Sequence, residues 1–576
     1  MLLTLLLSIL LFAGSFLTTC YADNMETQQV LLRPDNPLWN LLELAGFGLL
    51  FCGCLYLYAK IGERFRRGLL VFTLTFVFVL GVLLILFGRT VPAADALSVY
   101  NAAAEWILGN TDIIHPTASY LSYYPQQIGL MAFLELLLRL WNLTGLSAPA
   151  WHFIKLVYVC LLCVAIWFQY LSLQYLWPEN YKKISCCYLV LVCCNLPMIM
   201  YSSFVYGEIP SFAALSLGWY LLLRLLGNVS LGSASLDSAS LSSASPGSVS
   251  PGSVSPGSVS LGSVSLGSAS PGSASLDSSY RDNVSRNDAP SVTAHMLCRI
   301  IFTGFGSILF LTLSVMLRKN SLIPVIAVLL VLLFEALRPG RNGKMRLGLL
   351  IMAVCLAVTS VNVLPLTQKI YEKKAGNTLS SGVTAMSYLA MGMQEASRGC
   401  GWYNGFNIDT YDAAGMDTAL ANEISRLAID ERLAYFREHP GYTADFYLHK
   451  HLSQWADGTY ASRQATLATY GGRSSFFKEV YEGSLSGGYI EWCNAWQNVL
   501  YLGMLVFCID SLKKRRESRV ADRLYVYVGL IAVLGGFLFH TFWEANSRYI
   551  FSYSLLLMPY CGAGVYTLLL PKRGHR

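Results

Sequence analysis

Residues 68–88 read GLLVFTLTFVFVLGVLLILFG, a stretch without a single charged side chain. An α-helix needs about 20 mainly apolar residues to cross the hydrocarbon core of a bilayer. Arg67 precedes the stretch and Arg89 follows it, so charge returns at both of its ends. This pattern predicts a transmembrane helix, and the same criterion applies to the rest of the chain.

Apolar runs of this kind recur along the whole chain. Of its 576 residues, 54% are hydrophobic and 13% are charged, about half of the roughly 25% charge found in soluble domains. This composition excludes a soluble enzyme, a disordered chain and a fibrous protein. It predicts an all-α polytopic membrane protein with about twelve spans. The predicted spans lie near 3–19, 39–60, 68–88, 152–176, 184–204, 211–227, 299–317, 321–338, 345–365, 494–511, 523–541 and 549–569.

The basic clusters between the runs predict the topology. Residues 128–142 form a short apolar run that carries Glu135 and Arg139. Only if this run does not cross do all the clusters fall on one side, as the positive-inside rule requires. We therefore expect a juxtamembrane helix on the outer face and both termini in the cytoplasm; residues 3–19 are either the first span or a cleaved signal peptide. The clusters are 60–67, 182–183, 338–346, 513–519 and 572–576.

Five segments follow from this topology. The third outer segment has a helical periodicity over 416–455 that His439-Pro440-Gly441 interrupts, which predicts a small, mostly helical outer loop domain. Two cysteines that flank the interior of this segment, Cys400 and Cys493, are expected to be free, with a disulfide as the alternative. The segments are an N-terminal membrane module (1–227) with a catalytic first outer loop (89–151), a linker (228–298), membrane helices (299–365), the loop domain (366–493) and C-terminal membrane helices (494–576).

The linker contains a low-complexity repeat. Residues 229–278 repeat a five-residue unit of the form Ser-(Leu/Pro)-Gly-Ser-(Ala/Val). A tract so poor in large side chains cannot bury enough apolar surface to offset its ordering entropy. We therefore expect a disordered cytoplasmic linker; a phosphorylated tether is the functional alternative.

Charged residues at the outer ends of different predicted spans are the candidates for chemistry. Two carboxylates, Asp95 and Glu208, follow early spans, and Arg318-Lys319 follows a later one. Glu544 and Arg548 lie in the last outer turn. A carboxylate can act as a general base on a hydroxyl, and guanidinium or ammonium groups can hold a phosphate. Together they suit transfer from a phosphate carrier at the membrane surface.

Each of these residues also has a purely structural interpretation. Asp95 can cap a helix, and Glu208 can cap the helix that begins at Ile209-Pro210. Arg318 and Lys319 can snorkel toward water, and Tyr549 can belong to an aromatic belt. The outward position of the basic pair opposes the positive-inside bias, which favours the functional interpretation for that pair.

The order of several motifs resembles the C-type (GT-C) membrane glycosyltransferases. Within this group the chain resembles the protein O-mannosyltransferase-like and aminoarabinose-transferase-like enzymes of bacterial envelopes, with segments that look like those of Gram-positive members. The resemblance covers nearly the whole chain outside the repeat. Its segments are Tyr-Tyr-Pro-Gln-Gln-Ile-Gly at 123–129, Tyr-Gly-Glu-Ile-Pro-Ser at 206–211, Leu-Arg-Lys-Asn at 317–320, Gly-Trp-Tyr-Asn-Gly at 401–405, Lys-His-Leu-Ser-Gln-Trp at 450–455 and Trp-Glu-Ala-Asn-Ser-Arg-Tyr at 543–549.

The resemblance implies an enzyme that moves a sugar from a polyprenyl-phosphate donor to an envelope acceptor (a glycan, lipid or protein) on the extracytoplasmic face of the cell membrane. The expected reaction is inverting, which needs one base and no covalent carboxylate intermediate. Asp95 is the expected base, with Glu208 as a second catalytic carboxylate that orients the acceptor or a cation. The expected donor-phosphate ligands are Arg318, Lys319 and Arg548, and the expected substrate contacts are Tyr124, Gln126, Glu544 and Tyr549.

One departure from the pattern concerns metal use. Many of the similar enzymes carry two acids in the first outer loop, whereas Asp95 stands between Ala94 and Ala96. Binding of a divalent cation, Mg²⁺ or Mn²⁺, is therefore an open alternative, since Asp95 and Glu208 supply oxygen ligands. The rival functions are a lipid-linked glycan transporter or flippase, which predicts charges inside spans, and a non-catalytic envelope assembly protein.

Overall fold

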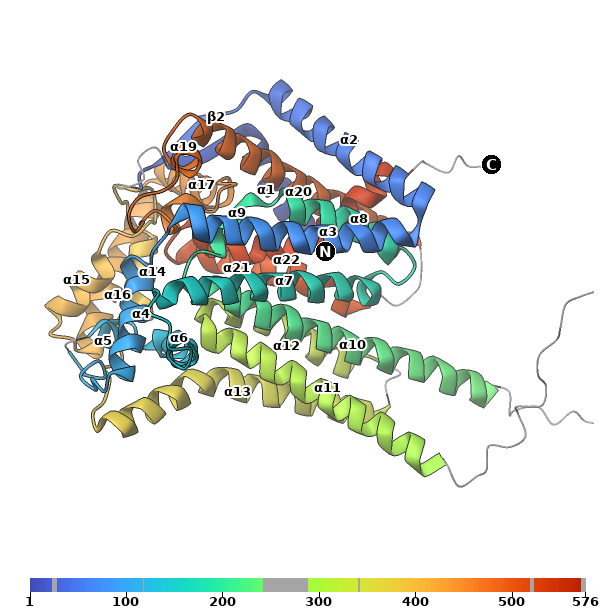
Figure 1. The fold of residues 1–576 in the computed structure, drawn as a ribbon, viewed down its shortest axis with the longest axis horizontal. Coiled ribbons are helices and arrows are strands. Elements are labelled where there is room, and N and C mark those ends of the chain that lie inside the picture. Colours follow the sequence, from blue (N-terminus) through green and yellow to red (C-terminus); the bar gives the residue numbers. More distant parts are fainter. Residues whose placement is uncertain (23–27, 118, 242–288, 340–341, 518–522, 571–576) are drawn as a thin grey trace, which may run out of the picture.

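The chain folds into a bundle of long helices with shorter elements gathered at one end (Figure 1). The computed structural model describes residues 1–22, 28–117, 119–241, 289–339, 342–517 and 523–570. Within the bundle, α10 packs against both α7 and α11, α20 packs against α22 and α1, and α12 packs against α13 and α21. The long helices run side by side, so their ends meet in two groups at opposite ends of the bundle.

Nine helices in the described residues are long and apolar enough to cross a membrane. Because such helices satisfy all their backbone hydrogen bonds internally, they are the form in which a chain enters a bilayer. The chain is therefore an all-α polytopic membrane protein, as predicted. The nine are α2 (Pro37–Ile61), α3 (Glu63–Leu83) with η1 (Leu84–Gly88), α7 (Ala150–Leu176), α10 (Glu208–Leu241), α11 (Ala289–Leu317), η3 (Lys319–Ser321) with α12 (Leu322–Leu337), α13 (Gly343–Ala375), α20 (Leu485–Glu517) and η4 (Leu524–Tyr527) with α21 (Val528–Phe542).

Three further predicted spans correspond to helices outside those nine. These are α1 (Leu2–Leu17), the pair α8 (Tyr181–Cys194) and α9 (Leu196–Tyr201), and α22 (Ser547–Leu569). The predicted continuous span 184–204 is interrupted at Asn195, whose side chain accepts a hydrogen bond from the Met198 amide. Asn195 thus caps a new helix, and Pro197 lacks the amide that would continue the old one.

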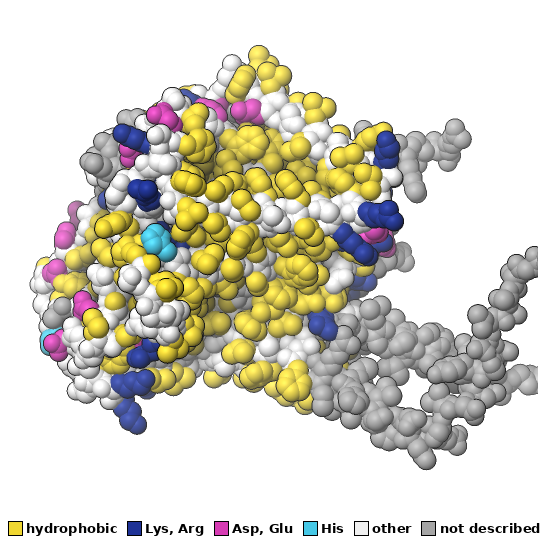
Figure 2. Space-filling model, viewed as in Figure 1, with side chains coloured by type: hydrophobic (Ala, Val, Ile, Leu, Met, Phe, Trp, Pro, Cys, Tyr) yellow, Lys and Arg dark blue, Asp and Glu magenta, His cyan; other side chains and the backbone are white. Residues whose placement is uncertain are grey.

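The surface over the bundle is apolar. Figure 2 shows hydrophobic side chains across the middle of the visible face and charged side chains toward its two ends. Exposed apolar residues such as Leu49 on α2, Phe72 on α3 and Phe302 on α11 would be unfavourable in water. This distribution fits a lipid environment around the long helices.

One end of the bundle carries the shorter elements. The segment between α3 and α7 forms α4 (Ala94–Ile107), α5 (Tyr120–Tyr123), η2 (Pro125–Gln127) and α6 (Ile128–Asn142). In Figure 1, α6 is seen nearly end-on, whereas the long helices run across the view. This orientation agrees with the prediction that residues 128–142 do not run along the spans.

The loop module, residues 376–484 between α13 and α20, lies at the same end (Figure 1). The predicted helical periodicity and its interruption are confirmed, because one helix ends at Glu438 and the next begins at Pro440. The module starts later and ends earlier than the predicted 366–493, since α13 and α20 extend into it. Cys400 and Cys493 are free. Its helices are α14 (Ala385–Gly392), α15 (Phe406–Ala413), α16 (Thr418–Glu438), α17 (Pro440–Trp455), α18 (Ser462–Ala465) and α19 (Ser475–Tyr481).

Two features differ from the all-helical prediction with its disordered linker. A two-stranded antiparallel sheet of β1 (Thr18–Ala22) and β2 (Val30–Pro34) follows α1 and joins the loop module through the bond from the Cys20 amide to the Ala456 carbonyl. The linker predicted over 228–298 is helical at both ends, as α10 reaches residue 241 and α11 begins at 289. A helix that has already nucleated adds further residues at little cost. The rest of the repeat lies outside the described residues.

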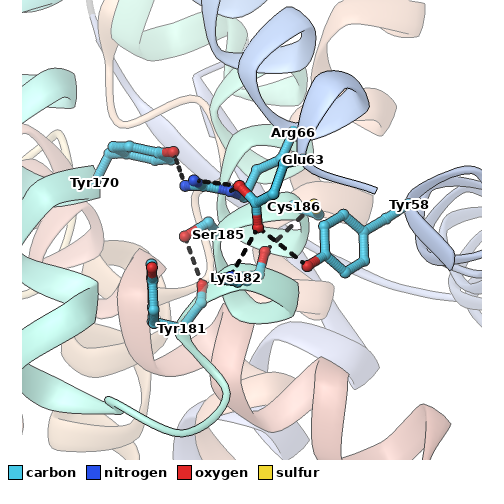
Figure 3. A network of polar contacts seen from close by, with 8 residues as sticks. All are labelled: Tyr58, Glu63, Arg66, Tyr170, Tyr181, Lys182, Ser185 and Cys186. Atoms are coloured by element: carbon cyan, nitrogen blue, oxygen red, sulfur yellow. Dashed lines mark hydrogen bonds and ion pairs between the residues drawn. The ribbon is translucent and has the colours of Figure 1, made fainter. Parts of the chain in front are cut away.

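An ion-pair network around Glu63 joins the start of α3 to α8 (Figure 3), and α3 begins at the end of the bundle opposite the shorter elements (Figure 1). Glu63 begins α3, and its carboxylate pairs with Arg66 at 2.7 Å and with Lys182 of α8 at 3.2 Å. Arg66 also donates to the Tyr170 hydroxyl. We call Glu63, Arg66 and Lys182 the Glu63 cluster; it links α3 and α8 where two of the predicted cytoplasmic basic clusters meet.

Candidate functional site

Three charged side chains meet at the end of the bundle that carries the loop module. Glu208 is the first residue of α10, Arg318 lies between α11 and η3, and Arg548 is in the first turn of α22. An oxygen of Glu208 lies 3.0 Å from Nη1 of Arg318 and 4.0 Å from Nε of Arg548. We call these three residues the Glu208 cluster. Its carboxylate is only 1% exposed, so the negative charge is held between two cations away from water.

Two glycines bring the end of α11 to this position. A Cβ on Gly207 would lie 2.5 Å from the Leu317 carbonyl oxygen, and one on Gly129 of α6 would lie 2.1 Å from the Met316 carbonyl oxygen. Real Cβ atoms do not approach this closely, so only glycine fits at either place. The residue that follows, Arg318, is thereby directed at Glu208.

Three serines join the same helix ends. The Ser211 hydroxyl of α10 donates to the Ser314 carbonyl of α11 at 2.8 Å and lies 2.6 Å from the Ser321 hydroxyl. All three serines are buried. Hydrogen bonds of this kind replace water at buried helix ends, so α10, α11 and α12 hold Glu208 and Arg318 in a fixed relation.

Aromatic rings surround Arg548. Its guanidinium carbon lies 5.8 Å from the ring centre of Phe204, 5.7 Å from that of Tyr206 and 5.5 Å from that of Tyr549. Cations over aromatic faces are stabilised by the ring quadrupole, more so when desolvated. The side chain of Asn546 accepts from the Arg548 amide and so begins α22 at this point. Arg548 therefore contacts three aromatic rings as well as the Glu208 carboxylate.

Asp95 lies in the first turn of α4 and is partly exposed. The residue before it, Ala94, has a φ of +47°, which is uncommon for a residue with a Cβ. Burial, and then the negative charge of Asp95, raise the pKa of Tyr124 and of Tyr206. The Asp95 charge is therefore within electrostatic range of both phenols, and Tyr206 belongs to the ring set around Arg548.

Glu544 lies in the turn between α21 and α22. Burial raises the pKa of its carboxyl to about 7, against the opposing effects of Arg548 and of a hydrogen bond from the Tyr549 hydroxyl. The nearby Asp95 charge adds to the increase. The side chain is 5% exposed, so this third carboxyl is buried within electrostatic range of both Arg548 and Asp95.

The structure therefore brings together most of the residues that the sequence singled out. Contacts join Glu208, Arg318, Arg548 and Tyr549. The charges of Asp95 and Glu544 lie within electrostatic range of this group or of Tyr124. Lys319 is different, because its side chain is exposed while that of its neighbour Arg318 is buried. Gln126 is partly exposed, and it is the next residue, Gln127, that donates to the Tyr206 hydroxyl.

Sequence reasoning missed three side chains. Tyr206 and Gln127 both stand inside quoted motifs, yet a hydrogen bond between residues so far apart in sequence has no local signal. Lys155 of α7 lies within the predicted span 152–176 and has no sequence signal of its own. It is fully buried and donates to the carbonyl oxygen and to the hydroxyl of Thr90, the latter at 2.9 Å, just before the Asp95 turn.

The site does not fit a metal held by Asp95 and Glu208. A divalent cation needs several oxygen ligands whose charge is free to bind it, whereas the Glu208 carboxylate faces two guanidinium groups. No group of three or more His, Cys, Asp or Glu side chains in the described part of the chain is placed to hold an ion. The chemistry below therefore uses the chain's own side chains.

Comparisons with protein-family models, with curated proteins and with solved structures found no match to this chain. Function must therefore be inferred from what the residues can do. The group combines a partly exposed carboxylate, a buried carboxyl with a pKa near neutrality and two arginines whose side chains are 10% and 20% exposed. Such a set can accept a proton at one place and hold an anion at another.

Proposed function

We propose that the chain is an integral membrane glycosyltransferase of the C type that uses a polyprenyl-phosphate sugar as donor. The observation that carries the proposal is the meeting of Arg318 and Arg548 around Glu208, with the Asp95 charge within electrostatic range of Tyr206 in the same ring set. A phosphate leaving group needs cations, and an acceptor hydroxyl needs a base. Both are present at one end of a membrane bundle.

The two arginines hold the donor phosphate in this proposal. Charge grows on the phosphate oxygens as the glycosidic bond breaks, and guanidinium groups stabilise that charge with paired hydrogen bonds. Glu208 contacts Arg318 at 3.0 Å, so we assign it the role of positioning the arginines rather than touching the sugar. Exposed Lys319 supplies further positive charge for the approaching donor.

Asp95 is the general base. The acceptor hydroxyl loses its proton to the Asp95 carboxylate while its oxygen forms a bond to the anomeric carbon. The bond from that carbon to the phosphate oxygen breaks, and the polyprenyl phosphate leaves with the electron pair. A single displacement inverts the anomeric configuration. Tyr124, Gln126, Glu544 and Tyr549 surround the sugar and acceptor.

The proposal includes the finer topology. Twelve spans are reached if α1, the α8–α9 pair and α22 cross together with the nine longer helices, and the site then lies on the extracytoplasmic face of the cell membrane. In support, the Glu63 cluster at the opposite end lies among the basic residues expected in the cytoplasm. The acceptor is a component of the cell envelope.

The direct test is sugar transfer in proteoliposomes. Purified protein would be supplied with radiolabelled sugars on polyprenyl phosphate and with an envelope extract as acceptor. We expect Asp95→Asn to lower transfer by about 10²–10⁴-fold, the usual contribution of a general base. Asp112→Asn is the matched control, because Asp112 is an exposed acid in the same loop.

Two outcomes would contradict the proposal. Movement of an intact lipid-linked sugar across the bilayer without transfer would indicate a flippase. Full transfer activity in Asp95→Asn at equal protein yield would remove Asp95 as the base.

A further inference from the structure

A buried lysine from the loop module binds the turn that carries Glu544. Lys450 of α17 is 0% exposed. Its ammonium group donates to three backbone carbonyls, those of Gly392, of Thr541 at 3.0 Å and of Trp543 at 2.8 Å. An ammonium group has three donors, so all three are used on backbone oxygen.

These three carbonyls lie at the ends of two helices. Gly392 is the last residue of α14, Thr541 is in the last turn of α21 and Trp543 follows that helix directly. The last carbonyls of a helix lack partners within it and carry the negative end of its dipole. Lys450 therefore satisfies two helix ends at once, which explains how a cation is tolerated in this position.

The backbone on both sides of Glu544 is tied to the loop module. Trp543 is held by Lys450, and the Ala545 amide donates to the Gly401 carbonyl at 2.7 Å. Gly401 has a φ of +70°, and a Cβ there would lie 2.8 Å from Cδ of Lys450. The lysine stem thus packs directly against the glycine that holds Ala545.

The same side of the loop module continues this contact along the turn. One helical turn after Lys450, the Gln454 amide group donates to the Asn546 carbonyl at 3.3 Å. Just beyond α17, a carboxylate oxygen of Asp457 accepts from the Ser547 hydroxyl at 2.6 Å. Residues 543–547 are therefore held in order by one row of side chains.

We infer that Lys450 is a positioning residue that fixes Glu544, and with it the start of α22, in the site. This inference rests on the proposed function for its effect on turnover, while its structural part is measurable without any activity. Lys450 touches backbone oxygens and acts on the site only through the turn.

The first experiment compares Lys450→Met with Arg463→Met in the full-length protein. Met keeps the stem and removes the donors. Arg463 is a matched control, because it is also buried in the loop module and donates to a backbone carbonyl, that of Tyr481 at 3.0 Å, away from the turn. Hydrogen–deuterium exchange of peptides covering residues 541–549 is the readout.

We expect faster exchange over 541–549 in Lys450→Met and wild-type exchange there in Arg463→Met. If Lys450→Met does not fold, Lys450→Gln serves instead, since its amide keeps a polar group at this position but supplies two donors in place of three. Unchanged exchange over 541–549 in the folded variant would overturn the inference.

The second experiment tests how Lys450 acts. Sugar transfer per folded molecule should fall about 10²-fold in Lys450→Met, the effect of misplacing a group by roughly 1 Å. Adding Glu544→Gln to Lys450→Met should lower it no further, because residues that act as one unit are not additive. Independent, multiplying losses would overturn the positioning role.

The two readouts separate the hypotheses. A wild-type protein that never transfers sugar, combined with faster exchange in Lys450→Met, would reject the proposed function while keeping the role of Lys450 in holding the turn. An active wild-type protein, combined with unchanged exchange in Lys450→Met, would keep the proposed function and reject the role of Lys450 in holding the turn.

Discussion

Two clusters with the same composition, one carboxylate and two cations, stand at opposite ends of the bundle. The Glu63 cluster joins α3 to α8, and its carboxylate and lysine are 37% and 47% exposed. The Glu208 cluster joins α10, the end of α11 and α22, and its carboxylate is 1% exposed. The residue types are alike, but the surroundings are not.

This difference separates a surface contact from a candidate site. Exposed ion pairs gain little, because water and salt screen them and long side chains lose entropy. Buried charges lose their hydration and persist only where partners compensate for that loss. A protein keeps such an expensive arrangement in a membrane bundle chiefly where charges do chemical work. The comparison therefore points to the Glu208 cluster.

The largest expected effect is on stability at Glu208. Glu208→Gln leaves Arg318 and Arg548, whose side chains are only 10% and 20% exposed, without their anion, which should cost about 3–5 kcal/mol of unfolding free energy. Thermal unfolding in detergent would measure it, with binding of inorganic phosphate as a check that an added anion restores part of the loss. An unfolding midpoint like that of wild type would remove the contrast between the clusters.

The next effect is on turnover at Arg318. Arg318→Ala should lower sugar transfer by about 10²–10³-fold, by analogy with the loss of one donor to a developing anion. The transfer rate of Arg318→Lys should lie between those of wild type and Arg318→Ala, because lysine offers a single point charge instead of the paired donors of a guanidinium group. Rates are compared per folded molecule, since the ion pair with Glu208 also stabilises the fold. Arg66→Ala, from the Glu63 cluster, is the control and should keep wild-type turnover.

A third effect concerns pH and the carboxyl beside the Glu208 cluster. The pKa of Glu544 is about 7 in the folded protein against an ordinary 4.5. The stabilisation that the fold gains from proton binding at Glu544 is thus complete below about pH 4.5 and is lost as pH rises through about 7. Glu544→Gln should flatten the decline in unfolding midpoint across this window. If the unfolding midpoint declined equally with pH in wild type and in Glu544→Gln, the group that titrates in this window would be a different one.

The smallest expected effect is at Glu63. Glu63→Gln should lower stability by only ~0.2–1 kcal/mol, the range for exposed ion pairs. The difference from wild type should shrink further at 1 M salt, where the screening length is about 3 Å. The same salt titration on Glu208→Gln should leave its larger loss in place. A loss at Glu63 as large as that at Glu208 would show that exposure does not distinguish the clusters.

Local features of the sequence were enough to predict most of the helices. The apolar stretch 68–88 ends where η1 ends, at Gly88, and the break at 439–441 separates α16 from α17 as predicted. The break in 184–204 was missed, although Asn195 and Pro197 are its local cause. The β1–β2 sheet was also missed, because its pairing depends on contacts with the loop module as well as on its own residues.

The sequence by itself determined that this chain crosses a membrane many times, because the length and apolarity of a helix are properties of neighbouring residues. It also marked Asp95, Glu208, Arg318 and Arg548 as charges at helix ends. Only the tertiary structure decided that Arg318 is buried against Glu208 while Lys319 is exposed, and that Lys450 holds the turn of Glu544. The reason is physical: these contacts join segments about a hundred residues apart in the chain, and helix packing, through close approaches such as that at Gly207, sets which helix ends meet.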